Sequence, residues 1–181
     1  TRESLKAGDV VVITGNPGSV AARETYVVGA TQDAGIWVID PDGSRGPGVT
    51  VAGNGDELTV VFTGLEPVDT DTPAAIFDVI LPSGGTNDDL TIDNVGSPLN
   101  GFAAVRVLDN AGTFETFRFA RKDTTRIMAN LNSGAGVDIF RLNYTTAPAT
   151  ASGGAFTLET YGHIAPGVLG QPADDSGVDQ L

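Results

Sequence analysis

The chain has 181 residues and a mass of 18.5 kDa, enough for one domain with a substantial hydrophobic core. It carries 23 acidic and ten basic side chains, giving a formal net charge of -13, and it has no cysteine and one histidine, His163. These counts exclude disulfides, zinc–thiolate and iron–sulfur sites, thiol nucleophiles, and any metal site that needs two histidines.

Short segments rich in Val, Ile, Thr and Phe recur about every 8–12 residues, which is typical of an antiparallel sandwich or barrel. In chain order, we expect the first strands at residues 9–14, 25–30, 35–40, 49–52 and 57–63. A second group is expected at residues 74–81, 90–93, 102–108, 113–120, 125–131, 137–145 and 155–160. Gly, Pro, Asn and Asp separate these segments and favour turns. The best helical candidate is a single turn around residues 70–75.

These patterns predict an all-β fold, a single jelly-roll-like β-barrel or sandwich of antiparallel strands over residues 1–163. The stretch from Pro67 to Pro73 is expected to cross between the two strand groups. No repeat is visible, which argues against a propeller or solenoid. Residues 164–181 contain three Gly, two Pro and three Asp with little to bury. We therefore expect an extended C-terminal arm that lies on another surface, such as a neighbouring subunit.

The acidic excess has an unusual composition. Asp occurs 17 times and Glu six times, whereas Arg occurs eight times and Lys only twice. Short carboxylates hold hydrated cations, and molar salt screens their mutual repulsion over about 3 Å. We interpret this as adaptation to high salt, with an ordinary acidic surface as the alternative. Binding to nucleic acid through bulk charge is unfavourable for either surface. No apolar run approaches 18 residues, which excludes a transmembrane helix.

Two acidic pairs are weak candidates for a structural cation, the one cofactor that the sequence leaves open. Asp40-Pro-Asp42-Gly-Ser44 resembles the start of a calcium loop, but Val51 stands where a bidentate carboxylate would be needed. A β-turn explains Asp40 and Asp42 better. Asp69 and Asp71 form a similar pair in a loop.

A catalytic triad of His163, Ser152 and an aspartate is not supported, because the chain has no Gly-x-Ser-x-Gly motif. Paired carboxylates of the glycosidase type cannot be singled out among 23 acids. We therefore expect no enzymatic activity. The chain starts Thr1-Arg-Glu without an apolar leader, which fits loss of the initiator methionine alone, although a leader already cleaved would leave the same start.

Charge is segregated along the chain. Residues 100–145 hold six bases and four acids, whereas the remainder holds four bases and nineteen acids. The segment Phe117-Arg-Phe-Ala-Arg-Lys122 could stack on single-stranded nucleic acid, but such binding suits a salt-adapted protein poorly. Two other interpretations stay open. The bases could pair within one sheet across strands, or they could meet acids of a neighbouring subunit. The second gives as interface candidates Arg118, Arg121, Lys122, Arg126, Asp174, Asp175 and Asp179.

Four strand segments carry a family resemblance: 72–81 (TPAAIFDVIL), 114–121 (FETFRFAR), 138–144 (DIFRLNY) and 155–161 (AFTLETY). With these segments, its acidic, cysteine-free composition and its C-terminal arm, the chain resembles the smaller major capsid protein of tailless icosahedral viruses of halophilic archaea. The resemblance implies an upright jelly-roll subunit in the virion capsid. Its implied partners are copies of itself, a related second capsid protein, other virion proteins and, at a distance, an internal membrane vesicle, with no direct contact to nucleic acid.

A second resemblance covers the amino-terminal third. Residues 5–14 (LKAGDVVVIT), 27–30 (VVGA) and 36–39 (IWVI) are similar to small β-barrel proteins that decorate tailed-virus heads. An extracellular β-sandwich that binds a ligand, a carbohydrate for example, is the alternative from a different class. A hydrolase is the least favoured alternative. We therefore expect a structural capsid subunit that assembles in high salt.

Overall fold

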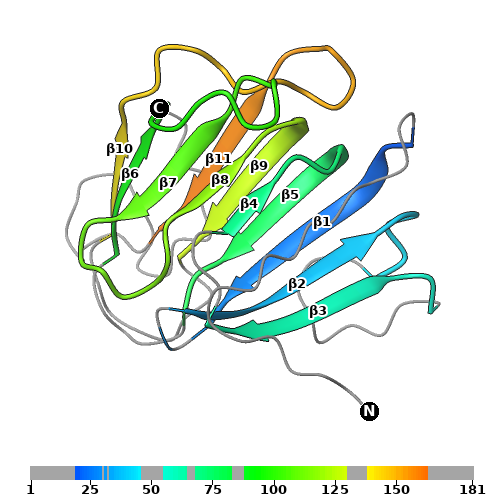
Figure 1. Ribbon diagram of the computed structural model, residues 1–181, viewed down its shortest axis with the longest axis horizontal. Helices are drawn as coiled ribbons and strands as arrows, with labels where there is room; N and C mark the ends of the chain where they lie inside the picture. Colours follow the sequence, from blue (N-terminus) through cyan, green and yellow to red (C-terminus); the bar gives the residue numbers. More distant parts are fainter. Residues whose placement is uncertain are drawn as a thin grey trace, which may run out of the picture.

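The described part of the protein is a sandwich of two β-sheets (Figure 1). A computed structural model describes residues 19–29, 31, 33–45, 55–64, 68–82, 88–129 and 138–162. These residues form eleven strands and no helix, which confirms the all-β prediction. Among them there is accordingly no helix of the length and apolarity needed to cross a membrane.

The larger sheet has six strands in the order β11-β9-β5-β1-β2-β3. Its strands are β1 (Ala21–Val28), β2 (Ala34–Asp40), β3 (Leu58–Thr63), β5 (Ala74–Ile80), β9 (Lys122–Met128) and β11 (Thr157–Tyr161). The second sheet has five strands in the order β10-β6-β7-β8-β4. Its strands are β4 (Val68–Thr70), β6 (Asp89–Asp93), β7 (Val105–Asp109), β8 (Phe117–Phe119) and β10 (Ile139–Leu142).

Aromatic side chains from both sheets fill the space between them. Alternation along β1 and β2 brings Tyr26 and Trp37 together, with ring centroids 4.9 Å apart. From β5, Phe77 contacts Phe117 and Phe119 of the opposite sheet, at 6.5 and 5.5 Å. All five rings are buried, and burying each one stabilises the fold by roughly 1.5–3 kcal/mol. The core therefore holds the two sheets together.

Parallel pairing is the main departure from the predicted fold. We expected antiparallel strands, but five of the nine strand pairs are parallel, namely β1–β5, β5–β9, β9–β11, β4–β8 and β6–β10. The reason is that the chain repeatedly changes sheet. A strand that returns to its first sheet after one passage through the other runs in the original direction. Jelly rolls are antiparallel architectures, so the described strand order confirms a sandwich without the pairing of a jelly roll.

Two segments of the chain pair with each other strand by strand, side by side within the sheets. Strands β4, β5 and β6 lie beside β8, β9 and β10, with Val68 opposite Phe117, Ala74 opposite Lys122 and Asp89 opposite Ile139. The paired residues are thus 49, 48 and 50 positions apart. The sequence hides this repetition because opposite positions carry different residues, and two of the pairs, Asp69–Arg118 and Asp78–Arg126, have opposite charges.

Most predicted strands lie within a few residues of observed ones. The helical turn at residues 70–75 was wrong, because β4 ends at Thr70 and β5 begins at Ala74. The stretch between Pro67 and Pro73 also contains β4, which the sequence did not indicate. The predicted strands at residues 9–14 and 49–52, His163 and the arm at residues 164–181 lie outside the described residues.

Candidate functional site

Arginines and carboxylates pair across neighbouring strands of each sheet. Arg118 of β8 forms a bidentate pair with Asp69 of β4, its direct partner in register. Arg106 of β7 does the same with Asp93 of β6, at 3.0 and 2.6 Å. The alternative of pairing within one sheet therefore describes these arginines, whose charges are compensated inside the subunit.

The same pattern extends over the six-stranded sheet. Arg126 of β9 donates from Nε to Glu159 of β11 at 2.9 Å and lies opposite Asp78 of β5. Arg23 of β1 also pairs with Asp78, which is fully buried. Burial raises the pKa of Asp78, although Arg23 acts in the opposite direction. In the other sheet, Arg141 pairs with Asp89.

The remaining interface candidates have different positions. The Arg121 guanidinium lies 4.7 Å from the centroid of the Phe102 ring, a cation–π contact. Lys122 was wrongly placed at an interface, because its side chain is fully buried between the sheets. The physical reason is that the buried carboxylate of Glu24 forms an ion pair with the Lys122 ammonium inside the core. Asp174, Asp175 and Asp179 lie outside the described residues.

Lys122 belongs to a polar network in an otherwise aromatic core. Its Nζ donates to Glu24 Oε2 and to the Thr72 carbonyl oxygen. The other carboxylate oxygen, Glu24 Oε1, accepts two hydrogen bonds: from Trp37 Nε1 at 2.6 Å and from Thr70 Oγ1 at 2.7 Å. Burial lowers the pKa of Lys122, and Glu24 opposes that effect. A buried pair that loses one partner destabilises a protein by about 3–5 kcal/mol.

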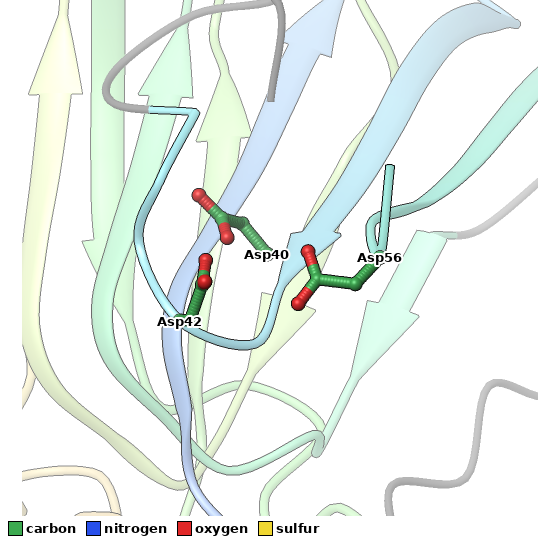
Figure 2. A group of neighbouring side chains, drawn as sticks. All are labelled: Asp40, Asp42 and Asp56. Carbon is green, nitrogen blue, oxygen red and sulfur yellow. The ribbon is translucent and has the colours of Figure 1, made fainter. Parts of the chain in front are cut away.

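A group of three carboxylates lies at the end of β2, and Figure 2 shows Asp40, Asp42 and Asp56 turned toward one another. One carboxylate oxygen of each lies within 4.8 Å of the others. Asp40 is buried and accepts backbone hydrogen bonds from Gly43 and Arg45 at 2.8 and 2.9 Å. Both bonds run from backbone N–H groups to the Asp40 side chain, so this carboxylate organises the chain that follows β2.

Asp56 was missed by sequence analysis because it enters the group from a separate connection, just before β3. Partial desolvation and repulsion from Asp42, Glu57 and Asp40 raise its pKa. The three carboxylates have the oxygen chemistry of a cation site, but they are also a common feature of an acidic surface.

The other candidate residues do not form sites in the described structure. Asp69 accepts hydrogen bonds from the Arg118 guanidinium, and Asp71 accepts one from Asn100 Nδ2 at 3.1 Å. Ser152, the serine considered for a triad, donates its hydroxyl to Asp123 Oδ1 at 2.9 Å on an exposed turn.

Two outermost strands expose apolar side chains. In the described part of the chain, β3 and β10 each have a partner strand on one side only, as do β11 and β4 at the other edges of the two sheets. On β3, Val61 is 69% and Leu58 49% exposed; on β10, Ile139 is 42% and Leu142 37% exposed. The six residues of β3 include no charge, no proline and no glycine. Figure 1 shows β3 and β10 at opposite ends of the molecule.

Sequence analysis also missed Glu24 and Thr70 as partners of Lys122, and Trp37 as a donor to Glu24. A weak signal was available, since Glu24 lies two positions before Tyr26 on β1 and shares its inward-facing side of the strand.

No family model, curated protein or solved structure matches the chain.

Proposed function

We propose that the protein is a structural subunit that assembles with copies of itself into a shell, namely the capsid of a virus from a high-salt environment. The observation that carries the proposal is the exposed apolar side chains of two outermost strands at opposite ends of the sandwich: Leu58 and Val61 on β3, and Ile139 and Leu142 on β10, which also carries Arg141. Natural proteins usually protect such edges with charges, prolines or bulges, because exposed backbone groups pair with other chains. β3 has none of these charges or prolines.

The position of the two edges favours a head-to-tail contact, in which β3 of one copy lies beside β10 of the next. Such a contact leaves one free edge at each end of a dimer, so that growth continues into rings or larger lattices. The paired arginines support this mode, because their charges are already compensated and do not set the contact. The capsid identity is supported by the composition and by the resemblance of the four strand segments, not by strand topology.

The first experiment is the native mass in molar salt, measured by light scattering on material from the natural source. We expect a megadalton particle that contains many copies of this chain. The ratio of this chain to the other shell proteins then separates a capsid subunit from a decoration protein. A stable monomer in molar salt would refute the proposal and favour the ligand-binding module.

Edge variants then test the contact. Val61→Lys blocks β3, and Ile139→Lys blocks β10, because a lysine on an edge strand disfavours pairing. We expect neither variant to assemble alone and an equimolar mixture to stop at heterodimers. The matched control is Val95→Lys, whose side chain is 55% exposed in the β6–β7 connection and belongs to neither β3 nor β10. It should assemble like the wild type. Normal assembly of both edge variants would refute the proposed contact.

A further inference from the structure

We propose that the side chains of Lys122 and Glu24 are joined, in the mature protein, by an amide bond that ties β9 to β1 through the core. This modification is independent of the proposed capsid role. It follows from the surroundings of the pair, in which an amine and a carboxyl group are held together where water is excluded.

The first argument is the position of the nucleophile. The Lys122 side chain crosses β5, its Nζ lies 5.3 Å from the centroid of the Phe77 ring, and it contacts Glu24 Oε2. Both side chains are fully buried. A desolvated lysine loses its proton more readily than one in water, and the neutral amine is the nucleophilic form. The burial that lowers the pKa of Lys122 therefore activates it.

The second argument is the arrangement at the electrophile. Trp37 Nε1 and Thr70 Oγ1 both donate to Glu24 Oε1, at 2.6 and 2.7 Å, whereas Nζ contacts the other oxygen, Oε2. When an amine attacks a carboxyl carbon, negative charge develops on the oxygen that stays. Two donors aimed at that oxygen stabilise this charge, as in the oxyanion hole of an acyl-transfer enzyme.

The reaction balances without any further reactant. The ammonium of Lys122 transfers one proton to Glu24 Oε2, which gives a neutral amine and a carboxylic acid. The amine nitrogen then bonds to the carboxyl carbon, a second proton passes from nitrogen to Oε2, and the bond from carbon to Oε2 breaks with release of water. The product is a secondary amide, and the net charge of the protein is unchanged because one positive and one negative group disappear together.

Thr70 and Thr72 connect this site to the passage between the sheets. Thr70 ends β4, and Thr72 lies in the three-residue connection to β5, where its carbonyl oxygen accepts from Nζ. The chain passage that produces the parallel pairing thus supplies one donor to Oε1 and one acceptor to Nζ. Together with Trp37 on β2, these contacts fix both reacting groups before any bond forms.

The test is the mass of the folded, mature full-length protein, measured after denaturation. We expect a mass lower than the sequence mass by one water, about 18 Da. Trypsin should release residues 24–45 joined to residues 122–126, because cleavage follows Arg23, Arg45, Arg121 and Arg126 but not a modified Lys122. The full sequence mass in the wild type would overturn the proposal, whatever any variant does.

Two variants assign the loss of water. Lys122→Met should have its full sequence mass and no joined peptide, whereas Lys6→Met, which replaces the chain's other lysine, should keep both the loss and the joined peptide. Asp42-Gly43 can also lose water by closing a ring, and this dipeptide is present in both variants. A loss that persists in Lys122→Met, with no joined peptide in the wild type, would assign the loss to that dipeptide and overturn the proposal. If Lys122→Met does not fold, the joined peptide of the wild type still decides.

Discussion

Phe77 is the residue whose truncation best tests the two-sheet core. It is fully buried on β5 and contacts Trp37 in its own sheet and Phe117 and Phe119 in the opposite one. Phe→Ala substitutions in cores cost about 3–5 kcal/mol, because apolar contact is lost and a cavity stays. Because Phe77 is fully buried and makes three ring contacts, we expect Phe77→Ala to fall in the upper half of this range.

Urea unfolding measures this cost, and the single tryptophan reports it. Trp37 is buried and stacks on Tyr26 and Phe77, so its fluorescence changes when the sheets separate. With an m-value of about 2 kcal/mol/M, the midpoint should fall by roughly 2 M.

The matched control for this measurement is Val95→Ala, at an exposed position. It should stay within about 0.5 kcal/mol of the wild type in the same salt. Phe77→Leu, which keeps most of the volume, should cost about 1 kcal/mol and serves if the alanine variant is unfolded. A loss below about 1 kcal/mol for Phe77→Ala would refute the packing described between the sheets.

Three further predictions concern charge. The urea midpoint of the wild type should rise from dilute buffer to molar salt, because salt screens the repulsion of a net charge of -13; an unchanged midpoint would contradict adaptation to high salt. Asp56→Asn should raise the midpoint in dilute buffer, since partial desolvation and, after it, repulsion from neighbouring carboxylates raise the pKa of Asp56; an equal gain in molar salt would show that repulsion is not the cause. Burial acts to raise the pKa of Asp93, but bonds from Arg106 and the Val95 backbone N–H outweigh it and lower the pKa. Its ionised form therefore stabilises the fold above the ordinary value of 3.8 and loses this effect as the pH falls through the lowered value. The stability difference between wild type and Asp93→Asn should shrink from about pH 6 to pH 3, and a constant difference would contradict the pairing.

The sequence predicted the strands well because their alternation is local. Residues 35–40 and 57–63 read as strands from their own side chains, and β2 and β3 lie within a residue of these ranges. Which strands pair is a different matter. Pairing depends on where the chain changes sheet, and the connections that decide this, such as Asp71–Pro73, resemble ordinary hairpin turns.

The charged residues show the same limit. A basic segment is visible in the sequence, but its partners are not, because Asp69 is 49 positions from Arg118 and Glu24 is 98 positions from Lys122. Lys122 reads as part of a surface stripe with Arg121, although the two neighbours point to opposite environments. Strand alternation does not reveal this, because Lys122 is out of phase with the inward-facing Thr125 and Ile127 of β9. Its burial is visible only in its tertiary contacts with Glu24 and Thr72. Asp56 likewise joined Asp40 and Asp42 only through tertiary structure.

The repeated change of sheet has a consequence for how the chain folds. The parallel neighbours in the larger sheet come from distant positions, with Ala21 beside Ala74, Ala74 beside Lys122 and Thr124 beside Thr157. Neither sheet contains a continuous stretch of chain that could complete it during synthesis. Topologies with many such long-range contacts fold slowly, because the entropy of closing long loops is lost before the stabilising contacts form. A nascent chain that ends before β9 would therefore expose both unfinished sheets and depend on the remaining residues to become stable.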